Sequence, residues 1–251
     1  MRVAFVGKGG SGKSTIAGTV ARVHARSRTR VLALDVDTVP GLAFSVGLGR
    51  ITDAGMPEEL GERRQGQGWV LREEIGADTL VARYALDAPD GIRFLQLGKL
   101  PRHVRPGSTT AFRHVVESFR PPGWSIIGDL AAGTRQSFAG WAGFASLLCL
   151  VMEPTQTALL SARRLRRLTE TMPEAIVGLV LSKVRNGASV EEMGAALGLP
   201  VWAVVPYDAE VAAAERAGVA PIDAAPESAG VMAITGLVST LSALDQGKTT
   251  T

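Results

Sequence analysis

The segment GKGGSGKST, Gly7 to Thr15, follows the apolar run VAFV and satisfies the phosphate-loop pattern G-x-x-x-x-G-K-[ST]. In such a loop, backbone N–H groups point at phosphate oxygens, and the N-terminus of the following helix adds a partial positive charge. Lys13 is expected to reach the β and γ phosphates, and the Ser14 hydroxyl to take one position on Mg²⁺. A glycine-rich turn without a ligand is the alternative. The candidate nucleotide-binding residues here are Gly7, Lys8, Gly9, Gly10, Ser11, Gly12, Lys13, Ser14 and Thr15.

Three carboxylates follow apolar runs that are expected to be strands. Asp35 and Asp37 come two residues apart after VLAL, and Asp129 ends the run SIIGD. At the carboxyl end of a parallel strand, a carboxylate can face Mg²⁺ and an attacking water. An apolar strand that ends in Asp is a Walker B pattern, in which Asp129 would hold the metal through water. The predicted magnesium residues are Ser14, Asp35, Asp37 and Asp129; solvated turn aspartates and a helix N-cap at Asp129 are the alternatives.

These residues need parallel strands to position them, and the hydrophobic pattern predicts such strands. Short apolar runs alternate with segments of helical period, which favours βαβ units and a doubly wound, mostly parallel α/β sheet flanked by helices. Residues 1–245 are expected to form one domain, with 51–90 as an irregular surface excursion and 246–251 as a disordered tail. Strands are expected at 3–6, 31–34, 92–97 and 125–129 and in the later runs LLCLVM, IVGLVLSKV and VWAVVPYD, and helices at 13–26, at 109–119 and after each later run, with two at the end.

The phosphate loop contains a second lysine, Lys8, and this stretch resembles the deviant phosphate loop K-G-G-x-x-K-[ST] of the MinD/ParA/nitrogenase-iron-protein class of ATPases. The resemblance implies a P-loop NTPase of the SIMIBI class, in which Lys8 crosses a dimer interface to the phosphates bound by the partner. A cation supplied in this way stabilises the transferring phosphoryl group only after two subunits have closed. A solvated loop lysine is the alternative. The implied catalytic residues are Lys8, Lys13 and Asp37.

Two further segments resemble the switches of this class. LDVDTVPGLAFSVGLG is similar to switch I, V-D-x-D-P-N-x-x-L, with Thr38 where proline is usual. The resemblance assigns Asp37 to orienting the attacking water and Asp35 to supporting the metal shell. In DLAAGTRQ, Gly133 would let the switch II backbone approach the γ-phosphate.

Over residues 1–245 the chain looks most like the nickel-insertion ATPases that mature carbon monoxide dehydrogenase. CLVMEPTQTALLSARRL follows their V-V-x-E-P-x-x-x-S-L-x-T-A-x-R-I, and DGIRFLQLGKL resembles their D-G-V-K-L-L-V-M-G-K-I. The resemblance implies an ATP-switched homodimer that docks on and matures a client metalloenzyme or similar complex. Those ATPases bind metal through C-x-C-P, where this chain has His103, Val104, Arg105 and Pro106. Because arginine is no metal ligand, neither nickel nor zinc is expected at this position.

Base recognition in this class implies a second group of nucleotide-binding residues. The class uses an Asn in N-K-V, and here the sequence is SKV, so that Ser182 replaces the amide. An Asn offers a donor and an acceptor together to an adenine edge, and a serine reaches less far. Adenine is the expected base, and ATP with Mg²⁺ the expected ligand. The implied base-end residues are Ser182, Lys183, Pro206, Tyr207 and Asp208.

Composition is that of an ordinary soluble globular protein: 251 residues, 46% hydrophobic, 20% charged, with a formal charge of +3. That charge is too small to imply a polyanionic partner by itself. The single cysteine, Cys149 in SLLCLVM, excludes an intramolecular disulfide and is expected on a buried strand. The sequence shows neither a signal-peptide pattern nor a membrane span, which predicts a cytoplasmic protein.

Three functions compete on this evidence. The first is the dimeric switch with an unidentified client protein. The second is a partition-type positioning ATPase whose ATP dimer binds DNA, for which ARRLRRL supplies Arg163, Arg164, Arg166 and Arg167. These arginines are expected to spread around a helix, where a solvated face is the commoner explanation, so nucleic acid is the less favoured partner. Membrane binding is not expected, because SAGVMAITGLVSTLSAL lacks basic residues. The third, a metabolic kinase or ligase, would need an acceptor pocket that the sequence does not locate.

Overall fold

The computed structural model describes residues 1–37, 41–49, 55–98, 105–131, 140–185 and 189–248. Within these residues, one eight-stranded sheet runs in the order β10-β9-β8-β1-β7-β2-β6-β5. Its neighbouring strands pair parallel except β5, which pairs antiparallel with β6. The predicted mostly parallel α/β sheet is therefore confirmed. The strands are β1 Arg2–Gly7, β2 Arg30–Asp35, β5 Leu86–Ala88, β6 Ile92–Gln96, β7 Trp124–Asp129, β8 Leu147–Met152, β9 Ile176–Val184 and β10 Val201–Pro206.

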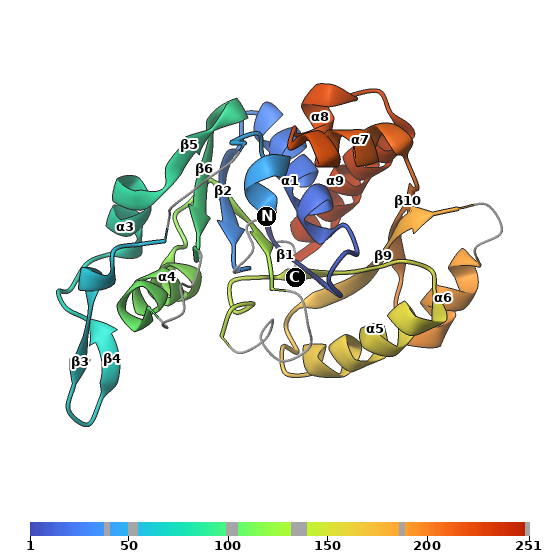
Figure 1. The fold of residues 1–251 in the computed structure, drawn as a ribbon. Helices are drawn as coiled ribbons and strands as arrows, with labels where there is room; N and C mark the ends of the chain where they lie inside the picture. The colour runs from blue at the N-terminus through green and yellow to red at the C-terminus, as the bar shows by residue number, and fades with distance from the viewer. Residues whose placement is uncertain (38–40, 50–54, 99–104, 132–139, 186–188, 249–251) are drawn as a thin grey trace.

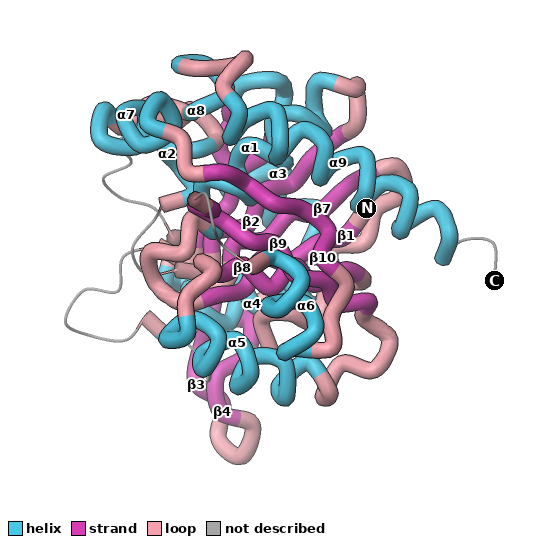
Figure 2. Tube along the Cα trace, turned by 90° about the vertical axis from the view of Figure 1, so that its right-hand side faces the viewer, coloured by secondary structure: helices cyan, strands magenta, loops and turns pink. Residues whose placement is uncertain are grey.

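Helices cover both faces of this sheet. Side chains of α3, α4, α5 and α6 pack into one hydrophobic core, and those of α1, α2 and α9 pack into the other. Figure 2 shows α1 and α9 on one side of the strands and α5 and α6 on the opposite side. The helices are α1 Lys13–Arg26, α2 Leu42–Ser45, α3 Ala77–Tyr84, α4 Pro106–Ser118, α5 Gln156–Thr169, α6 Val190–Leu197, α7 Ala209–Ala217, α8 Pro221–Ala224 and α9 Ala229–Lys248.

The central strands are apolar on both faces because each face meets a helical layer. All six residues of β8 are buried, and they alternate between the two cores, with Leu148 and Leu150 in one and Leu147 and Cys149 in the other. Burial raises the pKa of the Cys149 thiol well above its usual range. The expectation that Cys149 lies on a buried strand is confirmed.

Residues 55–90 of the predicted surface excursion form short regular elements, the last of which ends one residue beyond it. They are η1 Glu58–Leu60, an antiparallel hairpin of β3 Gly61–Arg64 and β4 Gly68–Leu71, α3, β5 and η2 Pro89–Gly91. The hairpin projects from the body, as Figure 1 shows. Its base is fixed on α4, because the Glu58 carboxylate accepts the Gly107 and Ser108 N–H groups at 2.9 and 3.1 Å. The hairpin is therefore held against α4, whereas β5 of the same excursion joins the main sheet directly beside β6.

A buried arginine joins the helix that follows the phosphate loop to the segments around it. Arg22 on α1 donates at 2.8 Å to each Asp223 oxygen, to Asp90, and at 3.2 Å to the Val46 carbonyl. Burial of this guanidinium would lower its pKa, but the two carboxylates outweigh that effect and the net shift is upward. Arg22 therefore holds α1, α8 and the end of α2 in one arrangement.

The C-terminal part contains three helices, α7, α8 and α9, where the sequence suggested two. Helix α9 continues to Lys248, three residues into the stretch expected to be disordered. None of the helices in the described part of the chain combines the length and the apolar character that crossing a bilayer requires.

Candidate nucleotide-binding site

The phosphate loop joins β1 to α1 in a conformation that only glycine adopts easily. Gly10 and Gly12 have φ of +80° and +84°, in the left-handed region. A Cβ on Gly7 would lie 2.3 Å from the Val151 carbonyl oxygen, so no side chain fits at this position. Beyond the loop, the Ile16 N–H donates to the Gly12 carbonyl at 3.0 Å and begins the helical ladder. The sequence pattern therefore predicted both the loop and the helix that opens at Lys13.

Lys13 lies at the carboxyl ends of the central strands, close to a buried carboxylate. Its exposed fraction is 6%, and that of Asp129 is 1%. Burial raises the pKa of Asp129 to about 6, although the positive charge of Lys13 and a hydrogen bond from Ser14 act to lower it. Asp129 Oδ1 is buried without a hydrogen-bond partner. An oxygen in that state needs a donor or a cation, so these residues fit a hydrated magnesium ion.

Asp35 lies beside Asp129, since the two residues are register partners on β2 and β7. Its Oδ1 accepts the Asp37 N–H at 3.0 Å and its Oδ2 accepts the Leu42 N–H at 3.2 Å. Complete burial and the charge of Asp129 raise the pKa of Asp35 well above its usual range. Asp35 therefore holds both described ends of the segment that resembles switch I, behind the metal position.

The segment that resembles switch I also approaches the magnesium side of the loop. A Cβ on Gly41 would lie 2.7 Å from Ser14 Oγ, so the backbone passes close to that hydroxyl. Gly41, Phe44 and Ser45 line the same pocket as Lys13 and Ser14. Thr38 and Gly133 lie outside the described residues.

The site is one cleft with two ends. The phosphate end, about 750 Å³, is lined by Gly10, Lys13 and Ser14, and the base end, about 450 Å³, by residues of β9, β10, α7 and α9. Both ends share Gly12, Thr15, Lys183 and Glu215, so they are continuous.

The predicted base-end residues Ser182, Lys183, Pro206, Tyr207 and Asp208 all line that end. The Ser182 hydroxyl donates at 2.6 Å to the Ser11 carbonyl of the phosphate loop. Lys183, whose φ is +52°, donates through Nζ at 2.6 Å to the Gly10 carbonyl. These two side chains therefore tie β9 to the phosphate loop.

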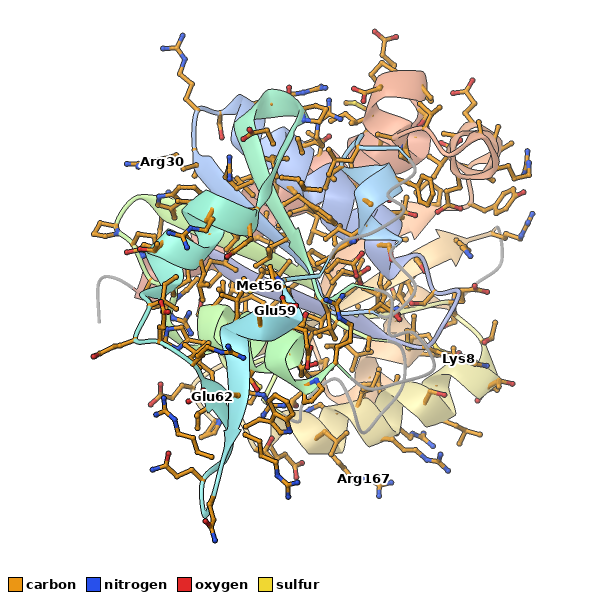
Figure 3. The ribbon with its side chains drawn as sticks, turned by 60° about the vertical axis from the view of Figure 1, so that its left-hand side comes forward. Lys8, Arg30, Met56, Glu59, Glu62 and Arg167 are labelled. Carbon is orange, nitrogen blue, oxygen red and sulfur yellow. The ribbon has the colours of Figure 1, made fainter. Side chains whose placement is uncertain are left out.

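Lys8 has a different environment from Lys13. It lies exposed on the phosphate loop (Figure 3), whereas Lys13 is buried. One loop thus presents one lysine to its own cleft and one to the outside.

Glu215 is a site residue that sequence reasoning missed. It lies on α7, lines both ends of the cleft and accepts a hydrogen bond from the Thr15 hydroxyl. Its position seven residues after Asp208, two helical turns beyond the N-cap of α7, is the signal that could have found it.

Two other surfaces bear on the sequence predictions. His103 lies outside the described residues, and the Arg105 guanidinium lies 3.9 Å from a Glu58 carboxylate oxygen. Within the described part of the chain, no three His, Cys, Asp or Glu side chains gather as a metal cluster. On α5, Arg163, Arg164 and Arg167 are exposed, and the half-buried Arg166 donates a hydrogen bond to the Thr169 hydroxyl.

The strand β1, a glycine-rich loop and a helix, with carboxylates at the ends of β7 and β2, the next two strands of the sheet, define a P-loop nucleotide-binding protein. The model of the CobQ/CobB/MinD/ParA nucleotide-binding domain matches residues 3–222, and the chain belongs to this family.

Similar proteins agree with this assignment. The chain is 27% identical over 231 residues to an uncharacterised ATP-binding protein of Methanocaldococcus jannaschii, across 87% of this chain and 90% of that protein. It is 24% identical over 249 residues to the carbon monoxide dehydrogenase accessory protein CooC of Rhodospirillum rubrum, across 90% and 91%. The septum site-determining protein MinD of Pyrococcus horikoshii, solved with Mg-ADP, has a TM-score of 0.72 and 18% identity across 97% and 96%, a likeness of fold.

Proposed function

We propose that this protein is a MgATP-binding, slowly hydrolysing ATPase that acts as a homodimeric switch on a client protein. The observation that supports it most is the pair of lysines on one phosphate loop, Lys13 buried at the cleft and Lys8 exposed. A cation that faces away from its own cleft can act on a second cleft brought against it. The similarity to CooC, an accessory protein of an enzyme, favours a client that is matured or remodelled. A cytoplasmic location is part of the same proposal.

Hydrolysis would use the residues of the phosphate end in separate roles. Lys13 and the loop N–H groups bind the β and γ phosphates, and Asp37 orients the water that attacks the γ-phosphorus as the bond to the β–γ bridging oxygen breaks. Ser14 and Asp129 would hold Mg²⁺, which neutralises charge on the phosphate oxygens. Lys8 of the partner would stabilise the charge that develops on the transferring group.

The position of Glu215 between the two ends suggests a contact with the sugar. A carboxylate accepts hydrogen bonds, and the ribose hydroxyls donate them. On ATP binding, Glu215 would exchange its bond from Thr15 for one from the ribose.

The proposal is tested by mixing two inactive variants. Lys8→Ala keeps its own water-orienting Asp37, and Asp37→Ala keeps Lys8, so each mixed dimer has one complete site. Because about half of randomly mixed dimers are mixed, we expect about a quarter of the wild-type turnover, against almost none for either variant alone. Absence of rescue, together with wild-type turnover per subunit that is independent of protein concentration down to nanomolar, would contradict the dimer.

The client is approached with the variant that should accumulate the ATP-bound state. Asp37→Ala with MgATP is expected to retain a specific partner in a pull-down that Lys13→Ala with MgATP does not retain, because only the first binds nucleotide. Equal retention by both variants would mean that the partner does not recognise the switch.

A second candidate function rests on the arginines of α5. Arg163, Arg164 and Arg167 are exposed together, which is the arrangement that phosphate contacts need. A partition-type ATPase would retain DNA only with ATP, and salt would weaken the retention steeply. Changing these three arginines to alanine should abolish retention, whereas the exposed Arg63 of the β3–β4 hairpin is a matched control. ATP-independent retention, or none, leaves the client-directed function as the only proposal.

A further inference from the structure

The base end of the cleft has few polar side chains free to read a nucleobase. Six of its described lining residues are apolar: Ile16, Val205, Pro206, Val211, Ala212 and Ile234. Its polar lining side chains are those of Thr15, Ser182, Lys183, Tyr207, Asp208 and Glu215. Their hydrogen bonds decide which nucleotide the cleft prefers.

Ser182 is committed to the phosphate loop. Its exposed fraction is 2%, and its hydroxyl donates at 2.6 Å to the Ser11 carbonyl. A hydroxyl has one proton, so Ser182 cannot also donate to a base. Breaking this bond would leave the carbonyl of a buried loop residue without its donor, which costs about 1–3 kcal/mol.

Asp208 is committed to the protein as well. Its Oδ1 accepts the Glu210 and Val211 N–H groups at 2.9 and 3.3 Å, and its Oδ2 accepts the Gly230 N–H at 2.8 Å. Both oxygens therefore serve to begin α7 and to hold the start of α9.

The remaining charged side chains of the lining, Lys183 and Glu215, line both ends of the cleft. Lys183 Nζ donates to the Gly10 carbonyl and lies 3.5 Å from a Glu153 oxygen, and Glu215 is bonded to Thr15. Lys183 is thus held to the phosphate loop and Glu215 to Thr15 near the start of α1, so the polar atoms of both side chains already have partners in the protein.

Tyr207 is the remaining polar side chain of the lining. The Arg185 guanidinium carbon lies 3.6 Å from the centroid of the Tyr207 ring, and Tyr207 is 42% exposed. A phenol donates and accepts, so it can pair with the amino group of adenine or with the carbonyl of guanine. A main-chain carbonyl likewise accepts from N6 of adenine or from N1 and N2 of guanine. Neither group distinguishes the two bases.

We propose that the base end accepts adenine and guanine nucleotides with little discrimination. The inference rests on the proposed function, because it requires a nucleoside triphosphate in this cleft. Sites that hydrogen-bond one substrate specifically reject an analogue by about 10⁴-fold or more, whereas apolar pockets discriminate by only about 10- to 200-fold. With the described side chains committed, the apolar walls and the shared phosphate contacts dominate the affinity, and both are the same for ATP and GTP.

Calorimetric titration of the wild-type protein with AMPPNP and GMPPNP in Mg²⁺ tests this without hydrolysis. We expect dissociation constants within about 20-fold of each other. A larger preference for either base overturns the inference while leaving the proposed function intact. Binding of neither analogue at millimolar concentration contradicts the proposed function instead.

Two variants extend the test beyond the wild-type ratio of the AMPPNP and GMPPNP dissociation constants. Ser182→Ala removes the bond to the loop and should weaken both analogues by the same factor, since the serine positions the phosphate loop. Tyr207→Phe should also leave the ratio unchanged. A change in the adenine-to-guanine ratio of more than about fivefold in either variant would show that this side chain reads the base and would overturn the inference.

Discussion

Each end of the cleft has an aspartate, and the two aspartates are in opposite states. At the phosphate end, burial raises the pKa of Asp129 to about 6, and one of its oxygens has no hydrogen-bond partner. At the base end, burial would raise the pKa of Asp208, but the N–H groups of Gly230, Val211 and Glu210 outweigh it, and the pKa is lowered. One oxygen of the first carboxylate lacks a hydrogen-bond partner, whereas both oxygens of the second accept hydrogen bonds from the protein.

The same contrast extends to neighbouring side chains. Among the described residues, four buried side-chain oxygens have no partner: those of Ser11, Gln96 and Asp129 lie in the phosphate loop or at the carboxyl edge of the sheet, and that of Thr19 lies inside α1. Ser182 and Asp208 at the base end are fully bonded to the protein. Native proteins rarely leave buried polar groups unpaired, so the three unpaired oxygens at the loop and the sheet edge are where a ligand would be accommodated. The phosphate end therefore has polar groups available to a ligand, whereas the polar groups of the base end mainly stabilise the protein.

The largest effect is expected from removing the buried lysine. Lys13→Ala loses charge-assisted contacts to the β and γ phosphates, each of which contributes about 1.5–3 kcal/mol. ATP affinity should fall by about 100-fold or more, as measured by calorimetry with Mg²⁺. Lys8→Ala is the matched control on the same loop and should keep its affinity within about threefold, because its side chain is exposed. Similar losses in both variants would show that the two lysines share one role.

The second largest effect is expected from changing Asp37, which should lower ATP turnover without lowering ATP affinity. Asp37→Ala should lower kcat by about 10²- to 10⁴-fold, the range of a group that orients or activates the attacking nucleophile, with ATP affinity nearly unchanged. Steady-state phosphate release and equilibrium titration of the same sample separate the two quantities. If affinity falls as much as turnover, Asp37 supports the bound metal rather than the attacking water.

The contrast between the two ends also explains what the sequence could predict. The phosphate loop, α1 and the strand-end aspartates were predicted because short-range patterns specify them: glycines for left-handed turns and apolar runs that end in a carboxylate. No such local pattern predicts the bonding of Ser182, because its hydrogen-bond partner Ser11 is 171 positions away in the sequence. The β3–β4 hairpin and Glu215 were missed for a related reason, since their roles depend on contacts with α4 and Thr15 that no local pattern encodes.

A smaller effect, on the free energy of unfolding, is expected from changing Asp129 at the phosphate end. Because the folded pKa of Asp129 is raised from 3.8 to about 6, its contribution to stability is fully present below about pH 3.8 and is lost as the pH rises through about 6. Asp129→Asn cannot ionise, so without nucleotide or metal it should be more stable than the wild type at pH 7.5 by about 1–3 kcal/mol, with a smaller difference at pH 4.5. Urea unfolding in EDTA measures this. The same variant should lose Mg²⁺-dependent ATP turnover, and a variant that is less stable than the wild type at pH 7.5 would contradict the raised pKa of Asp129.

The smallest effect is expected at Asp208, and its pH dependence should have the opposite sign. Asp208→Ala removes the N-cap of α7 and the contact with Gly230, which should lower the free energy of unfolding by about 1 kcal/mol at pH 7, while Asp208→Asn preserves the cap and most of the stability. Since the folded pKa is lowered, this contribution is present above the unfolded pKa and is lost as the pH falls through the folded value, so the loss in Asp208→Ala should hold down to about pH 4.5 and shrink below it. Because the carboxylate serves the fold, Asp208→Ala should weaken AMPPNP and GMPPNP by the same factor. A base-dependent loss of affinity, with stability unchanged, would instead make Asp208 a reader of the nucleobase and remove the distinction between the two ends.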